Sequence, residues 1–200
     1  MYICLDLSST CTGWSKFSDD GKLIEHGRIT SPPKMEPFHK IKYMVEGLEA
    51  IWLEADNVVI EGVFLGGFAG KNNVTVLTYL ARLSGAVIFS WLRNHENLPK
   101  IYMAVQARSL AGIKGSSQKA QVQIWVCREY KYASEDKLDE YESMVESLQG
   151  EYNAGEITRA QFKYRMDKVS DIIDEETTIG EDTADSIVLG VAFNNERRKK

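Results

Sequence analysis

The sequence has few cysteines and no long apolar run. Its three cysteines, Cys4, Cys11 and Cys127, are odd in number and no pair has C-x-x-C spacing, so neither a disulfide framework nor a structural zinc site is indicated. No uninterrupted apolar run approaches the roughly 18 residues of a transmembrane helix, and no basic segment precedes the first apolar stretch as in a signal peptide. We therefore expect a protein that uses no membrane and lies in the cytoplasm, of a bacterium or of a host cell if a phage encodes it.

Net positive charge is also lacking, since 24 basic residues stand against 29 acidic ones and the net charge is −5. The deficit is concentrated in residues 131–182, which hold 15 acidic and 6 basic residues, a net charge of −9, whereas the remainder has a net charge of +4. Several acids of the remainder are candidates for metal binding, so the surface available to a phosphate backbone is more basic than the total indicates. The charge therefore neither excludes DNA nor argues for it.

The chain opens with a pattern typical of strands. The segments YICLDLS and TGWSKFS are strand candidates, and the turn DDGK leads into a third, LIEHGRIT. A helical repeat over residues 36–54 precedes the short apolar strand at 57–61, and a second helical repeat runs from about Val74 to Asn94. Residues 100–105, KIYMAV, predict a further buried strand, and a helix follows from near Ser117. This alternation predicts an α/β fold whose mixed central sheet is flanked by helices, with an antiparallel portion at its start.

Before the last helix the sequence changes character. Apolar residues at helical spacing predict one helix around residues 138–148 and another around 162–173, with a break at residues 153–155. Thr158 and Gln161 have the spacing of a capping box for the second helix. We therefore predict an inserted acidic helical hairpin at about residues 131–178.

Four carboxylates stand where a metal site would place them. Asp6 and Glu61 each end a predicted strand, and Asp182 and Asp185 share one face at the start of the last helix, in EDTADS. Neighbouring buried carboxylates repel one another unless cations neutralise them. Oxygen ligands without histidine or cysteine favour Mg²⁺, with Mn²⁺ as a substitute, over zinc. Two such ions about 4 Å apart can activate water and stabilise the leaving oxygen of a phosphodiester.

Taken singly, each carboxylate has an ordinary structural interpretation. An aspartate at the end of a strand is often a turn residue, and Asp182 is also well placed to cap the last helix. Asp6 is the hardest to explain in this way, because LDLSS places a charge inside an apolar strand. Two strand-terminal acids followed by a D-x-x-D helix start form a set that is much less accidental.

The motifs together resemble those of the RuvC-type Holliday junction resolvases, particularly the longer, phage-encoded kind. LDLSSTCTGW is similar to the first-strand motif of that family, and VVIEGVF to its second motif. GIKGSSQKAQVQ is similar to its glycine-serine segment leading to a lysine, and EDTADSIVLGVAF to its closing D-x-x-D helix. The four motifs follow the order of the family and span nearly the whole chain apart from the acidic hairpin.

The resemblance implies one ribonuclease H-like nuclease domain over residues 1–200 and a homodimer that makes paired nicks in a four-way DNA junction. By motif position it implies that Asp6, Glu61, Asp182 and Asp185 bind the metal and catalyse the reaction. Lys119 would correspond to the lysine that lies near the scissile phosphate.

The resemblance also implies contacts with branched DNA. Phe64 would match the aromatic side chain that inserts at the junction centre, although packing into the core after a strand is an equally good interpretation. The residues expected to contact DNA are Phe64, Lys71, Arg108, Lys114 and Lys119. The loop GGFAGKNN and the acidic hairpin depart from the usual family pattern, so a flap or fork nuclease of the same fold stays open as an alternative.

Two other classes of function are alternatives to a nuclease. The opening D-x-S-S-T-x-T-G resembles the phosphate-binding start of sugar kinases and actin-like ATPases, but those proteins need a second domain and a glycine-rich adenosine motif that no later segment supplies. A protein that binds branched DNA without cleaving it is the other alternative. The presence of all four acids argues against it.

Overall fold

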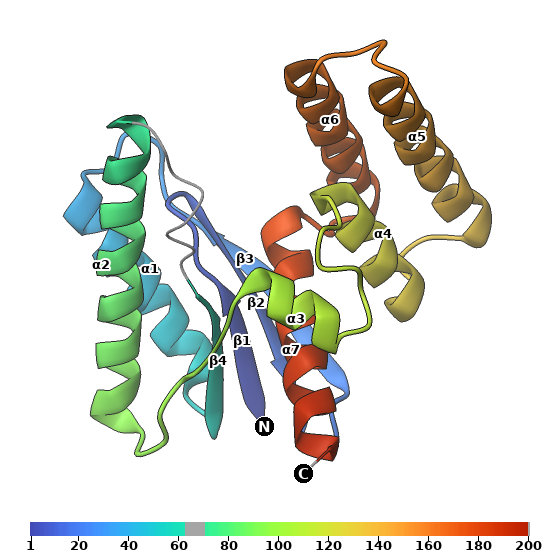
Figure 1. Cartoon of the computed structure of the whole chain (residues 1–200). Coiled ribbons are helices and arrows are strands. Elements are labelled where there is room, and N and C mark those ends of the chain that lie inside the picture. Colours follow the sequence, from blue (N-terminus) through green and yellow to red (C-terminus); the bar gives the residue numbers. More distant parts are fainter. Residues whose placement is uncertain (63–70, 200) are drawn as a thin grey trace.

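The computed structural model describes residues 1–62 and 71–199, which form a mixed β-sheet with helices on both faces (Figure 1). The strands in this part are β1 (Tyr2–Asp6), β2 (Cys11–Phe17), β3 (Leu23–Thr30), β4 (Asn57–Glu61) and β5 (Lys100–Tyr102). The helices are α1 (Pro37–Trp52), α2 (Lys71–Asn94), α3 (Ala104–Leu110), α4 (Lys119–Tyr130), α5 (Glu135–Asn153), α6 (Arg159–Thr177) and α7 (Glu181–Arg198).

The sheet has the strand order β3-β2-β1-β4-β5. The strands β1, β2 and β3 pair antiparallel with their neighbours, whereas β4 lies parallel to β1 and β5 parallel to β4. The antiparallel start followed by parallel strands is the arrangement expected from the sequence, and the predicted α/β fold with a mixed central sheet flanked by helices is confirmed.

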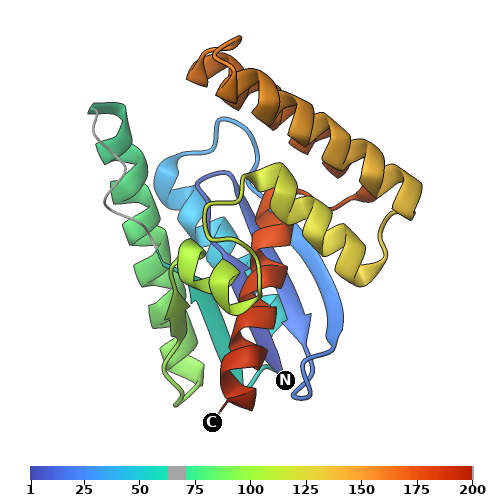
Figure 2. The same cartoon turned by 45° about the vertical axis from the view of Figure 1, so that its right-hand side comes forward.

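Alternation along the strands divides the core into two layers. Ile3 and Leu5 of β1 pack with α1 and α2 on one face of the sheet. Tyr2 and Cys4 lie on the opposite face, in the cluster that includes α4 and α7 (Figure 2). A side chain at position 6 therefore points to the α7 face, because successive residues of a strand alternate between the two faces.

The predicted acidic hairpin is confirmed as α5 and α6, which pack against α4 rather than against the sheet. The turn at Gly155 has a positive φ of 77°, and the capping box of Thr158 and Gln161 begins α6 as predicted. Buried Gln123 of α4 donates a hydrogen bond to the carbonyl of Ile179 (2.8 Å) and accepts one from the hydroxyl of Ser170 (2.7 Å). These bonds fix the base of the hairpin on the rest of the protein.

One strand prediction is wrong in extent and in burial. Residues 100–105 were expected to form a buried strand, but β5 ends at Tyr102 and the short helix α3 begins at Ala104. The strand lies at the edge of the sheet, where Ile101 is half exposed, and Val105 is exposed on α3. The apolar composition of residues 100–105 predicted burial, but a strand at the edge of the sheet leaves some of its side chains exposed.

Helix α2 contains a long apolar segment. The Val74–Asn94 segment has a mean hydropathy of 1.4, and its length and composition alone would allow it to cross a membrane. Only 22% of the apolar 18-residue stretch within this segment is buried. Leu83, Val87 and Trp91 pack into the core with α1. The opposite side of the helix carries exposed apolar side chains, including Val74 and Phe89.

Helix α7 crosses the sheet at a point where β2 carries a glycine. A Cβ atom on Gly13 would lie 2.0 Å from the carbonyl oxygen of Asp182 and 2.6 Å from the backbone nitrogen of Thr183. Neither backbone atom can move away independently of the helix. A side chain at position 13 would therefore displace the start of α7.

We expect Gly13→Ala to destabilise the protein by about 2 kcal/mol, because overpacking against backbone atoms typically costs about 1–3 kcal/mol. The control is Gly150→Ala in α5, where an added Cβ would meet nothing within 4 Å. That substitution should leave stability unchanged or slightly higher. Thermal unfolding of both variants measures the difference, and equal melting temperatures would contradict the close approach of α7.

Candidate active site

Two strand ends bring the first pair of carboxylates together. The parallel register of β1 and β4 pairs Tyr2 with Asn57 and Leu5 with Ile60. Asp6 and Glu61 are the next residues on these strands, so they end neighbouring strands at the same edge of the sheet. Each lies two residues after a side chain that faces α7: Asp6 after Cys4 on β1, and Glu61 after Val59 on β4. Their side chains therefore point to the same face of the sheet.

Helix α7 supplies the third carboxylate. Its position is fixed by hydrogen bonds from the sheet: the hydroxyl of Ser15 donates to the carbonyl of Ser186 (2.8 Å), and the hydroxyl of Tyr2 donates to the carbonyl of Gly190 (3.1 Å). Asp185 lies one residue before the first of these contacts. The helix therefore holds Asp185 over the ends of β1 and β4.

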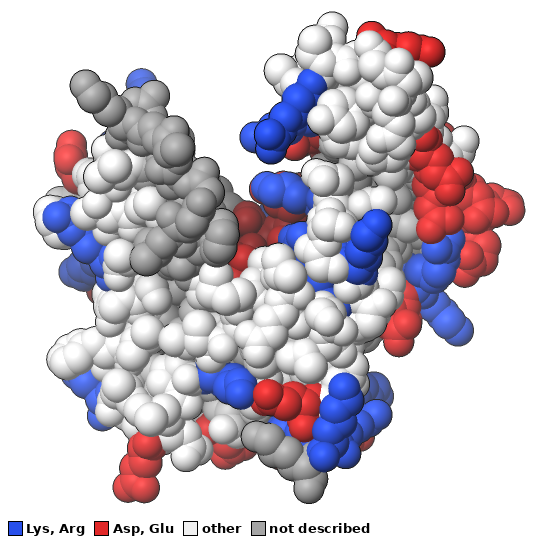
Figure 3. Space-filling model, in the orientation of Figure 1, with Lys and Arg blue, Asp and Glu red and all other residues white. Residues whose placement is uncertain are grey.

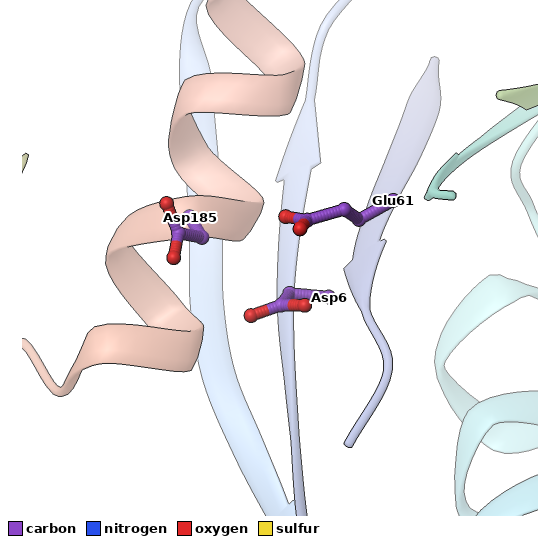
Figure 4. A group of neighbouring side chains, drawn as sticks. All are labelled: Asp6, Glu61 and Asp185. Carbon is purple, nitrogen blue, oxygen red and sulfur yellow. The ribbon is translucent and has the colours of Figure 1, made fainter. Parts of the chain in front are cut away.

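The three carboxylates converge on one point. Each of Asp6, Glu61 and Asp185 offers one oxygen atom, and these atoms all lie within 4.8 Å of one another. Figure 4 shows the three side chains pointing toward a common space from β1, β4 and α7. The set contains only carboxylate oxygens, which are the ligands that Mg²⁺ and Mn²⁺ prefer.

The electrostatics of this cluster favour a bound cation. Burial raises the pKa of Asp6 well above its ordinary value, and the neighbouring charges of Glu61 and Asp185 raise it further. Burial also raises the pKa of Glu61 to about 7, with a further contribution from Asp185. Burial raises the pKa of Asp185, although Arg108 opposes the rise. Three ionised carboxylates at such a point need positive charge, so the residues fit a divalent metal ion.

Asp182, the fourth predicted acid, lies beside the cluster and is not among its three members. It lines a cleft of about 680 Å³ together with Cys11, whose thiol lowers the pKa of the carboxylate. Burial, and then the charge of Glu181, raise its pKa to about 6. The charge of Asp182 also acts on Asp6 and Glu61, so it belongs to the same electrostatic environment.

Arg108 was expected to contact DNA, and the structure places it inside the site. Its guanidinium group forms an ion pair with Asp185 (3.1 Å) and donates a hydrogen bond to the carbonyl of Ser117 (2.8 Å). Only 14% of the side chain is exposed, and its Nε has no hydrogen-bond partner among the described residues. In this conformation Arg108 orients Asp185.

Lys119 lies at the start of α4, next to the start of α7. Its ammonium group forms an ion pair with the carboxylate of Glu181, and 52% of the lysine side chain is exposed. Burial lowers the pKa of Lys119, but the bond to Glu181 and the charges of Asp182 and Asp185 outweigh this effect and raise it. Lys119 is therefore a protonated group at the rim of the carboxylate cluster.

The other residues predicted to contact DNA are not brought to the cluster by the described structure. Lys114 is exposed and lines a separate depression with Gln149 and Asn153. Phe64 lies outside the described residues, and so does the side chain of Lys71, whose backbone begins α2. Their proposed roles stay predictions.

Sequence reasoning missed two partners within the site. Glu181 precedes Asp182 in the motif EDTADS and could have been noted as a third acid at that helix start, but nothing in the sequence pairs it with Lys119. Cys11 has no role in the sequence analysis, whereas in the structure it lines the cleft beside Asp182 and its thiol lowers the pKa of that carboxylate. Both contacts join segments that are far apart in the chain.

Comparison with known proteins gives matches among solved structures alone. No protein-family model and no curated protein sequence matches the chain. A structure of RuvC from Thermus thermophilus is 14% identical, with a TM-score of 0.47 over 63% of this chain and 77% of that one. The T. thermophilus RuvC in complex with a Holliday junction substrate is 11% identical, with a TM-score of 0.45 over 55% of this chain and 68% of that one. At these identities the likenesses concern the fold alone.

The carboxylate cluster predicts how stability depends on pH and on metal. In the absence of metal, Glu61 holds its proton up to about pH 7 in the folded state, against an ordinary pKa of 4.5. The folded protein then binds more protons than the unfolded chain, so stability should fall as the pH rises from about 5 to 8. We expect the melting temperature measured in EDTA to fall over this range, and Glu61→Gln to flatten the decline.

Mg²⁺ should reverse this loss at pH 8. A ligand present at 100 times its dissociation constant stabilises the folded state by about 2.7 kcal/mol, which raises the melting temperature by several degrees. The rise should disappear in Asp6→Asn, which removes a predicted ligand with little change in shape. An equal rise in the wild type and in Asp6→Asn would show that Mg²⁺ binds elsewhere.

Proposed function

We propose that this protein is a metal-dependent endonuclease that cuts Holliday junctions and other branched DNA. The observation that carries the proposal is the convergence of Asp6, Glu61 and Asp185 within 4.8 Å at the ends of two parallel strands. The order of the four sequence motifs supports the same assignment. Carboxylate clusters that hold divalent ions are suited to hydrolysing phosphodiester bonds.

The proposed chemistry divides the work among named residues. Asp6, Glu61 and Asp185 would hold the divalent cation, which supplies Lewis acidity toward the phosphodiester and neutralises its charge. Arg108 keeps Asp185 in place through their ion pair. Lys119, protonated and half exposed at the rim, would stabilise the negative charge that develops on the phosphate. To do so its ammonium group exchanges the carboxylate of Glu181 for the phosphate.

Asp182 supports a second metal position in this proposal. It lies on the open side of the cluster, in the cleft through which a substrate would approach. Its carboxylate is partly buried, and its pKa of about 6 leaves it mostly ionised at neutral pH. A two-metal mechanism, with Asp182 as a ligand of the second ion, is the form of catalysis that we propose.

A homodimer is part of the proposal because a four-way junction presents two equivalent strands. Two identical active sites related by two-fold symmetry can meet both strands. Helix α2 offers a surface for such a contact. Its exposed side carries Val74, Ala81, Gly85, Phe89 and Leu92 at spacings of three, four and seven residues, the pattern of a helix that packs against another helix. Gly85 stands in open space, so a second helix can approach closely there.

The test is cleavage of labelled four-way, three-way, flap and linear DNA in Mg²⁺ by the wild type and by Asp6→Asn. We expect paired nicks in the four-way junction, and a loss of at least about 100-fold in Asp6→Asn, because metal ions supply several kcal/mol to such reactions. The matched control is Asp139→Asn, which neutralises an exposed acid of α5 and should keep full activity.

Different results separate the alternatives within this experiment. Equal cutting of flaps or forks would broaden the activity to a general branched-DNA nuclease. Tight binding of the junction without cleavage, in Mg²⁺ and in Mn²⁺, would identify a structural DNA-binding protein. Absence of both binding and cleavage would contradict the proposal.

A further inference from the structure

The acidic hairpin does not present a uniformly acidic surface. Figure 3 shows Asp and Glu side chains gathered on its far side, over α5, whereas Lys and Arg side chains lie on the side that faces the central hollow. On that inner side α6 contributes Arg159 and Lys163, which are four residues apart and share one face of the helix. The net charge of −9 therefore conceals a basic region on the inner face, at the start of α6.

This inner face adjoins the carboxylate site. One depression of about 360 Å³ is lined by Lys119 of α4 and by Arg159 and Lys163 of α6, with Asp167 as its single acid. The larger cleft shares Lys119, Lys163 and Asp167 with it and continues to Asp182 at the start of α7. Its other acids, Asp171, Asp174 and Glu181, each form an ion pair with a basic side chain. A strand of DNA at the carboxylate cluster would thus extend along α6.

Arg159 and Lys163 differ from the neighbouring cations of the cleft in having no charged partner among the described residues. Arg28 forms an ion pair with Asp174 (2.7 Å), and Lys119 forms one with Glu181. Arg159 and Lys163 are exposed and form no ion pair or side-chain hydrogen bond with any residue in the described ranges. Exposed, unpaired cations in a concave surface attract phosphate groups.

The hairpin is also held firmly enough to act as a wall. Its apolar residues belong to the same core cluster as α4 and α7, and Gln123 bonds to both Ser170 and Ile179. The ion pair between Arg28 and Asp174 ties α6 to β3 across the cleft. The position of Lys163 relative to Asp182 is therefore set by packing.

We propose that the inserted hairpin forms a second wall of the DNA cleft and binds backbone phosphates next to the scissile one through Arg159 and Lys163. The proposal rests on the proposed function, because it takes DNA at the carboxylate cluster as its starting point. The insertion would then attract DNA, whereas its net charge alone predicts that it repels DNA. The acids over α5 face away from the DNA in this arrangement.

The experiment measures binding of a labelled four-way junction, in Ca²⁺ to prevent cleavage, as a function of salt concentration. The variants are Lys163→Gln and Arg159→Gln, with Arg165→Gln as the matched control on the same helix. Arg165 pairs with Glu151 and lines a different depression, between α5 and α6, so the control removes the same charge away from the cleft.

Each phosphate contact contributes about 0.9 to the slope of log affinity against log salt. We therefore expect Lys163→Gln and Arg159→Gln each to lower that slope by about 1, and Arg165→Gln to leave it unchanged. The ratio of wild-type affinity to Lys163→Gln affinity should fall about three-fold between about 50 and 200 mM salt. Circular dichroism confirms that the variants are folded.

The outcomes distinguish this proposal from the proposed function. If the wild type binds and cuts the junction while Lys163→Gln and Arg159→Gln keep the wild-type slope, the hairpin is not a DNA wall and the nuclease assignment stands. An equal loss in Arg165→Gln would show a general charge effect and would also overturn the proposal. If the wild type neither binds nor cuts any DNA, both proposals fail together.

Discussion

The arrangement of this protein depends on one constraint: three carboxylates that repel one another are held together at one edge of the sheet. Asp6, Glu61 and Asp185 meet where two parallel strands end beneath a helix, and each has a raised pKa because it is partly buried beside the others. The fold opposes the repulsion with the Ser15 and Tyr2 hydrogen bonds that seat α7 on the sheet. The absence of a side chain at Gly13 allows the same close approach. A structure that concentrates negative charge in this way is suited to bind a divalent cation.

Two basic groups partly neutralise the negative charge of the site. Arg108 pairs with Asp185 from inside the protein, and Lys119 pairs with Glu181 at the rim. The first is mostly enclosed and fixes a ligand, whereas the second is half exposed and can exchange its partner for a phosphate. The sequence motifs predict that both residues contact DNA, but the surroundings of Arg108 and Lys119 in the structure are different.

Much of the fold and part of the site were predictable from the sequence. Asp6 and Glu61 interrupt apolar strands, and Asp182 and Asp185 stand three apart at a helix start, so local patterns were enough to select them. The ion pair of Lys119 with Glu181 and the position of Cys11 beside Asp182 were not predictable, because packing between distant segments creates them. The end of β5 at Tyr102 was misjudged because apolar composition does not distinguish an edge strand from a buried one.

The hairpin shows the same limit more clearly. Its existence, its helices and the capping box at Thr158 follow from periodicity. Its orientation follows from Gln123, which looks like an ordinary polar residue in the sequence but is buried and anchors the base of α6. Only that orientation places Arg159 and Lys163 toward the cleft and the acids of α5 away from it. Net charge over a segment therefore predicts little about the face that a partner meets.

The central claim is that Asp6, Glu61 and Asp185 together hold a divalent metal ion. Anomalous diffraction from crystals soaked in Mn²⁺ tests it most directly, because manganese scatters anomalously and the protein carboxylates do not. The account predicts a manganese peak bonded to oxygen atoms of all three residues, and its loss in Asp6→Asn. Well-diffracting crystals with manganese bound only elsewhere, or with none at the three carboxylates at saturating Mn²⁺, would contradict it.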